Sequence, residues 1–148
     1  METLEQDLET MTALVPLLMG AFQRRLARDL SGFGLTVSQF VTLNALEDYE
    51  GECRMGPLAA AALQSAASMT GIVDRLLERG LVERQRHPED RRSVVVQLTD
   101  KGRALLCEVK EHRRQHWRAL FGQFSLEDRR RMQAVLRAMI ERLGEDGE

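Results

Sequence analysis

The feature that most constrains the fold is a tract, residues 65–102, in which a short helical pattern runs directly into two β-rich segments. Apolar residues recur at its start with the three- and four-residue spacing of a buried helix face: Met69, Ile72, Val73, Leu76 and Leu77. Gly80 is typical of the residue just after a helix. Segments 81–86 and 93–99 are rich in β-forming residues and flank a polar tip, Pro88-Glu89-Asp90-Arg91-Arg92. The tract therefore predicts a helix followed at once by a hairpin that carries two adjacent arginines at its tip.

Upstream of this tract the sequence predicts two further helices. Thr36 followed by Gln39 fits a capping box, which indicates the start of a helix. A short extended piece begins at Cys53, and Pro57 fits the first position of an alanine-rich helix. Ser65 then restarts helical periodicity after a tight turn. Two short helices joined in this way form a helix-turn-helix, and the hairpin that follows makes it a winged helix.

Long amphipathic helices are predicted on both sides of the winged region. In the first helix apolar residues alternate in steps of four and three: Leu4, Leu8, Met11, Val15, Leu18 and Phe22. We expect Pro16 to kink it. Thr99 and Ser125 fit the caps of two C-terminal helices, and the last helix has its own apolar face: Met132, Val135, Leu136, Met139, Ile140 and Leu143. Seams this regular need a partner surface, so we expect a homodimer; the alternative is a monomeric bundle in which they cover one another.

The predicted fold class is mainly α with a small β-hairpin wing, in a single domain over residues 1–148. Residues 36–98 are expected to form a winged helix-turn-helix DNA-binding region. Residues 1–30 and 99–144 are expected to form a helical dimerisation domain. A chain of 148 residues that is 43% hydrophobic is long enough for one compact core.

Composition narrows the functional class. The net charge is −2, so any basic surface for nucleic acid must come from local clustering. No apolar run approaches the roughly 20 residues that cross a bilayer, and the N-terminus is acidic, so we expect a cytoplasmic protein without a membrane partner. Cys53 and Cys107 have no CxxC spacing. The sequence contains no GxSxG or HExxH motif and no phosphate-binding glycine loop, so we predict no catalytic residues and no cofactor.

The residues from Ser65 to Leu106 resemble the recognition helix, wing and following helix of the MarR family of transcriptional regulators. The resemblance rests on the Thr70–Arg84 run T-x-x-V-D-R-L-x-x-x-G-L-V-x-R, on the Asp-Arg-Arg of the tip and on the exit LTDKG. The flanking helices match the family's helical order over nearly the whole chain. The resemblance implies a homodimer that binds a pseudo-palindromic operator in double-stranded DNA, usually as a repressor. It also implies release of the DNA when a small phenolic or other ligand binds.

In the family, an arginine of a D-x-R motif enters the minor groove from the wing tip, and the aspartate orients it through a salt bridge. The resemblance therefore implies that Arg92 is inserted and that Asp90 orients it. A narrow minor groove has an enhanced negative potential that attracts guanidinium groups. The alternative is that the Asp-Arg pair only stabilises a tight turn.

The residues expected to contact DNA are Arg54, Gln64, Ser65, Ser68, Thr70, Arg75, Arg84, Arg86, Asp90, Arg91 and Arg92. His87 is a further candidate for a phosphate contact. Capping is the alternative role for Ser65, and solvated surface charge is the alternative for the strand arginines. Gly71 stands where the family often has an arginine, which shifts the expected specificity toward groove shape, methyl contacts and the wing.

An effector is expected in the crevice between the winged and helical regions. The candidate lining residues combine apolar surface with a polar tip: Phe40, Tyr49, His112, His116 and Trp117. The alternative is that these are ordinary core or dimer-contact residues. His112 and His116 also have metal-ligand spacing. Zinc-sensing relatives need further ligands on the second helix, which here has no histidine, so we predict no metal site.

Two other functions stay open at the level of sequence. A cysteine could sense oxidants if it lay in an accessible, electropositive setting. The winged helix could also dock an acidic protein instead of DNA. Only DNA binding with several phosphate contacts would weaken steeply as salt rises.

Overall fold

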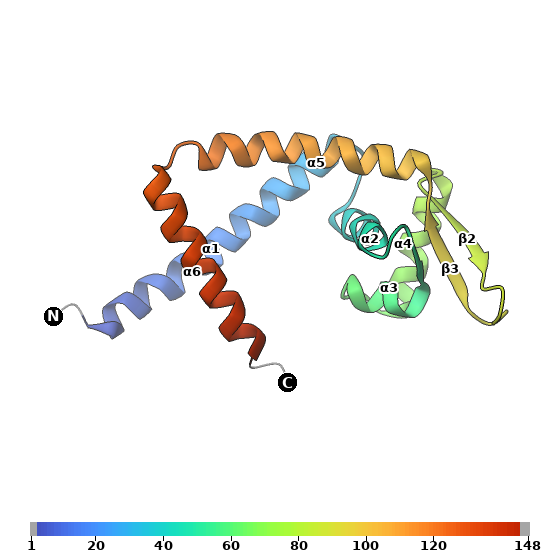
Figure 1. Cartoon of the computed structure of the whole chain (residues 1–148), viewed down its shortest axis with the longest axis horizontal. Coiled ribbons are helices and arrows are strands. Elements are labelled where there is room, and N and C mark those ends of the chain that lie inside the picture. The colour runs from blue at the N-terminus through green and yellow to red at the C-terminus, as the bar shows by residue number, and fades with distance from the viewer. Residues whose placement is uncertain (1–2, 146–148) are drawn as a thin grey trace. The chain divides into compact units, whose positions relative to one another are not determined.

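The computed structural model describes residues 3–145 and has the predicted order of elements (Figure 1). The helices are α1 (Leu4–Ser31), α2 (Val37–Asp48), α3 (Met55–Ala61), α4 (Ala66–Glu78), α5 (Asp100–Phe121) and α6 (Leu126–Glu145). The strands are β1 (Glu52–Arg54), β2 (Val82–Arg86) and β3 (Val94–Leu98). The chain divides into two compact units after Lys110, within α5. The order confirms a mainly helical fold with a β wing.

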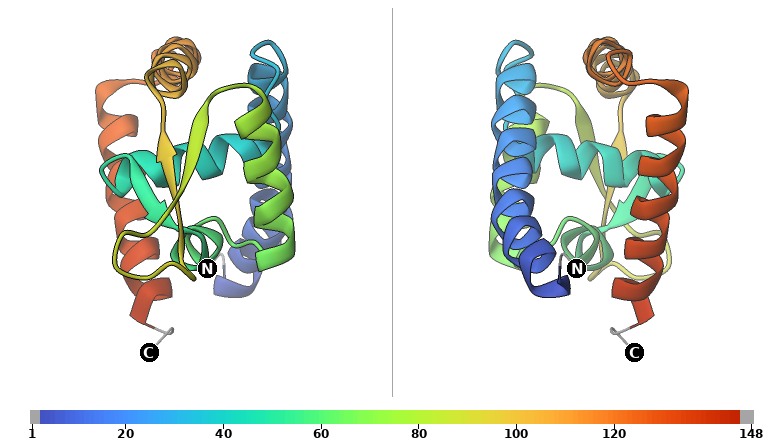
Figure 2. Two further views of the ribbon diagram at one scale, coloured as in Figure 1. Left: turned by 90° about the vertical axis from the view of Figure 1, so that its right-hand side faces the viewer. Right: turned by 90° about the vertical axis from the view of Figure 1, so that its left-hand side faces the viewer.

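The three strands form an antiparallel sheet in the order β1-β3-β2. In β2, Val82 pairs with Leu98 and Arg86 with Val94, so the hairpin is in register along its whole length. The sheet and helices α2, α3 and α4 lie together in the first unit (Figure 2, left). Fully buried side chains come from every helix of this unit and from the wing: Leu30, Leu43, Leu46, Leu58, Met69, Leu76, Leu81, Leu106, Val73, Val82, Val96 and Val109.

Local signals place the start of α2 and α4 as predicted. The Thr36 hydroxyl accepts a hydrogen bond from the backbone N–H of Gln39 at 3.2 Å, and the Gln39 side chain accepts one from the Thr36 N–H at 3.1 Å. Ser65 is the N-cap of α4. Gly80 follows α4 with a φ of 68°, a left-handed conformation that favours glycine.

One detail of the predicted helices differs from the structure. Pro57 is the third residue of α3, because the helix begins at Met55. Proline is tolerated there because the first-turn N–H groups of a helix have no intrahelical partner. Pro16 lies inside α1, which runs from Leu4 to Ser31, and the expected kink at Pro16 stays a prediction.

Arg79 and Thr99 fix α4 and the hairpin to the rest of the first unit. The Arg79 guanidinium donates to the carbonyl oxygens of Phe33 and Gly34 at 3.1 and 2.8 Å. The Thr99 hydroxyl donates to the Gly80 carbonyl at 2.7 Å and accepts from the Gly102 N–H at 3.0 Å, which confirms Thr99 as the cap of α5. These bonds hold α4 at both its C-terminal end and the base of the wing.

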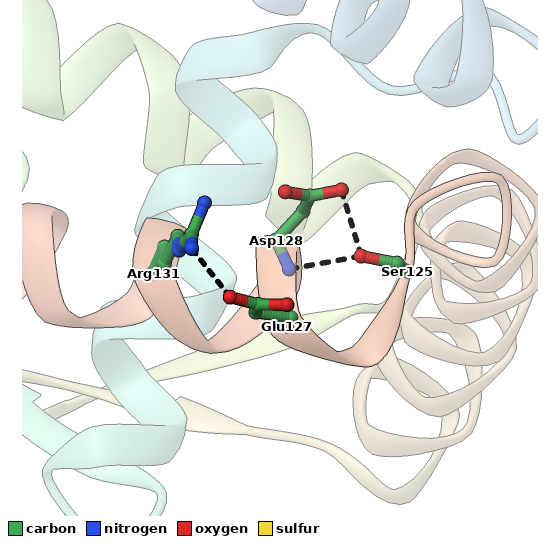
Figure 3. Close-up of polar contacts among 4 residues, drawn as sticks. All are labelled: Ser125, Glu127, Asp128 and Arg131. Atoms are coloured by element: carbon green, nitrogen blue, oxygen red, sulfur yellow. Dashed lines mark hydrogen bonds and ion pairs between the residues drawn. The ribbon is translucent and has the colours of Figure 1, made fainter.

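In the second unit, Ser125 caps α6 as predicted (Figure 3). Its hydroxyl accepts from the Asp128 N–H at 3.1 Å and donates to the Asp128 carboxylate at 2.7 Å. One turn further on, Arg131 pairs with Glu127. The apolar residues of α6 remain largely exposed, from Met139 at 47% to Leu143 at 71%. Within residues 3–145 we find no helix with the length and apolar character that a membrane span requires.

Candidate nucleic-acid interface

The N-terminal half of α4 presents small polar side chains at the surface. Ser65, Ser68 and Thr70 are exposed, and Gln64 is half-buried. The Ser65 hydroxyl accepts from the Ser68 N–H at 3.1 Å and donates to the Ser68 hydroxyl at 3.0 Å. Thr70 donates to the Ala66 carbonyl at 3.0 Å. The Ser65 side chain therefore caps the helix, while hydroxyl lone pairs on this turn stay available to a ligand.

The surface of α4 at Gly71 has no side chain and no close neighbour. A Cβ atom placed on Gly71 would have no neighbour within 4 Å, and Arg75 one turn later is exposed. Asp74, beside them, forms an ion pair with Arg84 of β2 at 3.2 Å. Arg84 is thus held against α4 rather than extended into solvent, and about half of each side chain remains accessible. A shallow hollow of about 240 Å³ lies beside this pair, lined by Met55, Gly56, Ala66, Thr70, Arg84 and Val94.

Backbone hydrogen bonds close the loop at the wing tip, residues 87–93. The His87 N–H donates to the Ser93 carbonyl at 2.8 Å, and the Ser93 N–H donates to the Asp90 carbonyl at 3.0 Å. One carboxylate oxygen of Asp90 accepts from the Arg92 backbone N–H at 3.1 Å. The other accepts from the Ser93 hydroxyl at 3.1 Å. These bonds, the one from Arg92 first, hold the pKa of Asp90 below its ordinary value.

The expected salt bridge from Asp90 to the Arg92 side chain is not what the structure has. Among residues 3–145, Asp90 forms no ion pair with a guanidinium, and its carboxylate instead fixes the backbone on which Arg92 stands. The reason is that Asp90 stands only two residues before Arg92. At this spacing its carboxylate accepts the Arg92 backbone N–H and forms a compact Asx turn. Arg91 and Arg92 are both exposed.

Sequence reasoning missed the central place of His87 in this loop. Its Nδ1 lies 3.2 Å from the Glu89 N–H and 3.3 Å from the Asp90 N–H. Its Nε2 lies 3.2 Å from Nη2 of Arg54, which reaches it from β1. The only signal in the sequence was a histidine directly before the proline of the tip. Arg86, the residue before it, is exposed on β2.

Two of the candidate effector residues, Phe40 and Tyr49, lie in the first unit. Phe40 packs against the core from α2, whereas Tyr49 is 47% exposed at the end of the same helix. Tyr49 is the C-cap residue that follows Asp48, the last residue of α2. It lines a polar recess of about 420 Å³ with Glu50, Gly51, Glu52, Gln97, Leu98 and Arg103. The expectation that Phe40 and Tyr49 line an effector site stays a prediction.

The other candidates lie in the second unit. His112 and His116 make an edge contact with ring centroids 4.5 Å apart. Trp117 stacks on Phe121 with centroids 5.4 Å apart and an interplanar angle of 11°. Each pair is one helical turn apart on α5, so these rings support one another along the helix.

The two cysteines have different surroundings. Cys53 is buried in β1, and burial raises its pKa, against a smaller lowering by a backbone hydrogen bond at Arg54. Cys107 is exposed on α5. A buried thiol with a raised pKa is a poor nucleophile, so Cys53 lacks the properties of a redox sensor.

Comparisons with known proteins agree with this geometry. Residues 33–93 match the model of the MarR family. The HTH-type transcriptional repressor NicR of Pseudomonas putida is 38% identical over 128 residues, which cover 84% of this chain and 80% of the relative. The transcriptional repressor MprA of Escherichia coli is 30% identical, over 77% of this chain and 65% of that protein.

Solved structures show the same fold. A MarR family protein from Bacillus stearothermophilus has a TM-score of 0.85 with 25% identity, covering 96% of this chain and 99% of the other. AbsC, a MarR family transcriptional regulator from Streptomyces coelicolor, has a TM-score of 0.74 with 28% identity, and the match covers 97% of both chains.

Proposed function

This chain belongs to the MarR family of winged helix-turn-helix transcriptional regulators, and from that premise we propose how it binds its operator. In this proposal two copies bind a pseudo-palindromic site and repress transcription. In each copy α4 lies in the major groove and the wing tip lies over the adjacent minor groove. The observation that carries the proposal is the exposure, within one compact unit, of the N-terminal half of α4 and of both tip arginines.

The small side chains of α4 support a close approach to the bases. Ala67 and Gly71 offer no long side chain that would hold the helix away from the groove floor. Gln64, Ser68 and Thr70 can reach base edges or phosphates near the positive end of the helix dipole. Arg75 is the one long cation in the middle of the helix. Sequence preference should therefore come from methyl contacts and groove shape as much as from bidentate hydrogen bonds.

The wing tip supports a minor-groove contact. Asp90 is occupied by the loop's own donors, so in the described part of the chain neither Arg91 nor Arg92 has a carboxylate partner. The fixed backbone lowers the entropy that Arg92 loses when it enters a narrow groove, and the negative potential of that groove attracts its guanidinium. The exposed Arg86 on β2 and the accessible part of the Arg84 side chain support contacts to flanking phosphates.

The exposed seams of α1 and α6 support dimerisation. Along α1 the apolar seam is between 40% exposed at Phe22 and 79% at Leu4, and α6 is exposed to a similar degree. Soluble monomers rarely leave so long an apolar surface in water. To bind two half-sites one DNA turn apart, a two-fold dimer must hold the two copies of α4 about 34 Å apart.

A small, mostly apolar effector, for example an aromatic acid, is the remaining part of the proposal. The rings of His112, His116 and Trp117 on α5 are the residues that support it. Screening aromatic acids for both thermal stabilisation and release of DNA tests this part. If no compound changes DNA affinity, the proposal of a small effector fails while the proposal of DNA binding stands.

Operator binding itself is tested by selecting bound genomic fragments and sequencing them. A filter-binding titration of the selected fragment against salt then follows. We expect affinity to fall linearly with salt on logarithmic axes, with a slope set by the number of phosphates contacted. A protein that enriches no fragment, or whose binding ignores salt, would contradict the proposal.

A further inference from the structure

Hydrogen-bond donors lie near both ring nitrogens of His87, although an imidazole has at most one acceptor nitrogen. Two backbone N–H groups, of Glu89 and Asp90, point at Nδ1, and the Arg54 guanidinium nitrogen lies 3.2 Å from Nε2. A neutral imidazole has one acceptor nitrogen and one N–H donor, and a protonated one has no acceptor. The ring nitrogen that carries the proton must therefore face another N–H donor.

The fixed loop decides which nitrogen this is. The Glu89 and Asp90 N–H groups belong to a backbone closed by the bonds from His87 to Ser93 and from Ser93 to Asp90. They cannot turn away, whereas the exposed Arg54 side chain can turn toward water. The ring therefore keeps its lone pair on Nδ1 and its proton on Nε2. The Nε2–H and the nearby Arg54 N–H are then two donors side by side with no acceptor between them.

We propose that Arg54 and His87 form an anion site for one phosphate oxygen of the DNA backbone, an inference that rests on the proposed function. A single oxyanion placed against both donors relieves their mutual repulsion and accepts a hydrogen bond from each. Arg54 supplies the charge, and His87 is the positioning residue that ties this phosphate to the conformation of the wing tip. The site thus couples β1, which is remote in sequence, to the loop that presents Arg92.

The charges around the pair are compatible with an anion. Asp90 interacts with both Arg54 and His87, but its two oxygens already accept from Arg92 and Ser93. Glu89 follows in the loop and is exposed, as is Arg86 before it. Helix α3, which β1 leads into, contains no charged residue. Arg54 is the cation in contact with the ring, whereas both Asp90 oxygens accept from donors of the loop.

The tautomer can be measured in the free protein, independently of DNA. Nitrogen-15 NMR of the imidazole, at a pH where the ring is neutral, should show Nδ1 without a proton and Nε2 with one. Titration with inorganic phosphate should shift the Nε2 and Arg54 side-chain signals, and Arg54→Ala should remove the shift at His87. A proton on Nδ1, or signals that respond to neither phosphate nor DNA, would overturn the inference even if the protein binds its operator.

The DNA arm uses three variants. Arg54→Ala should weaken operator binding roughly 10-fold and lower the salt slope by about 1, as expected for one lost phosphate contact. His87→Asn keeps an acceptor oxygen at the place of Nδ1 and removes the outer donor, so it should weaken binding about 3-fold. The double variant should cost less than the product of the two, because both side chains hold one phosphate.

Arg103→Ala removes one positive charge outside the proposed interface and serves as the matched control. We expect it to leave the salt slope unchanged. If Arg54→Ala behaves like Arg103→Ala while the wild-type protein binds its operator, the phosphate site is wrong and the proposed function stands. Binding of inorganic phosphate without any effect of Arg54→Ala on DNA affinity would overturn the assignment to DNA. Absence of all operator binding would instead sink the proposed function, and the tautomer measurement would still stand by itself.

Discussion

At the scale of the residue, the tip arginine is the most direct test of the interface. Arg92 stands on a backbone fixed by Asp90 and is exposed. Arg92→Ala should lower operator affinity by about 1 to 3 kcal/mol, the order expected for a lost groove contact, without changing the thermal unfolding of the protein. Quantitative gel-shift assays and circular dichroism measure the two quantities. Equal affinity of the variant and the wild type would reduce the tip to an ordinary turn.

Asp90 should affect DNA binding through the loop and not through a salt bridge. Asp90→Ala removes the acceptor for the Arg92 N–H, whereas Asp90→Asn keeps one amide oxygen there. We expect the alanine variant to lose part of the affinity that Arg92→Ala loses, and the asparagine variant to lose less. Were Asp90→Asn as weak as Asp90→Ala, the charge of Asp90 would matter more than its geometry.

The lowered pKa of Asp90 also gives the loop a pH limit. The folded loop lowers the pKa of the Asp90 carboxyl, so the ionised carboxylate stabilises the loop. This stabilisation is fully present above the ordinary pKa of about 3.9 and is lost as the pH falls through the lowered pKa. The amide signal of Arg92 should therefore titrate with a midpoint below about 3.9. Asp90→Asn should abolish this titration, and a midpoint above 3.9 in the wild type would contradict the hydrogen bonds described for the loop.

The two thiols should differ sharply in reactivity. Cys53 is buried, and burial raises its pKa, which favours the unreactive thiol form, whereas Cys107 is exposed. We expect iodoacetamide to modify one cysteine of the folded protein quickly, and Cys107→Ser to remove this fast reaction. Mass spectrometry identifies the modified residue. Fast modification at Cys53 would require β1 to open and would revive a redox role for it.

At the scale of the element, the base of the wing tolerates no side chain at the start of α5. A Cβ atom on Gly102 would lie 2.1 Å from the Leu81 carbonyl oxygen and 2.9 Å from Leu98. Gly102→Ala should therefore lower the free energy of unfolding by about 1 to 3 kcal/mol, because backbone atoms must move. Gly71→Ala is the matched control in α4, where the Cβ meets nothing within 4 Å.

The control should stabilise the protein by about 0.5 to 1 kcal/mol, the difference between alanine and glycine inside a helix. Urea titrations measure both values. Equal stability of the two variants would mean that α5 and the hairpin do not pack as closely as described.

Most elements were predictable because their signals are local. The capping box at Thr36, the caps at Ser65, Thr99 and Ser125 and the left-handed Gly80 each depend on residues within a few positions. Contacts between distant residues were not predictable from periodicity. Arg79 on α4 lies 45 residues from the Gly34 carbonyl that it bonds. The same holds for Arg54 and His87, so the sequence indicated the wing but not the pair that joins it to β1.

At the scale of the whole molecule, the distribution of apolar and polar residues distinguishes two surfaces: the polar surface of the winged helix-turn-helix and the apolar seams of α1 and α6. The winged unit buries its apolar side chains among its own elements and leaves polar residues outside. The seams of α1 and α6 do the reverse, since the residues that repeat at helical spacing are the exposed ones. In the proposed function the first surface meets a polyanion, and the second meets another copy of the chain.

A charge placed on the α6 seam should therefore separate the copies. Leu136 and Ile140 are 50% and 69% exposed, and one turn separates them on the helix. Leu136→Asp or Ile140→Asp would place a carboxylate in the apolar interface, and its desolvation should raise the dimer dissociation constant at least about 10-fold. Ala134→Asp introduces the same side chain about 160° around the helix from Leu136 and is the matched control.

Sedimentation equilibrium at micromolar concentration should give a dimer for the wild type and the control, and dissociation or unfolding for the seam variants. Operator affinity should fall in parallel, because each half-site is then bound without its neighbour. A monomeric wild-type protein would contradict the proposed assembly, and dimerisation unaffected by both seam variants would move the interface away from α6.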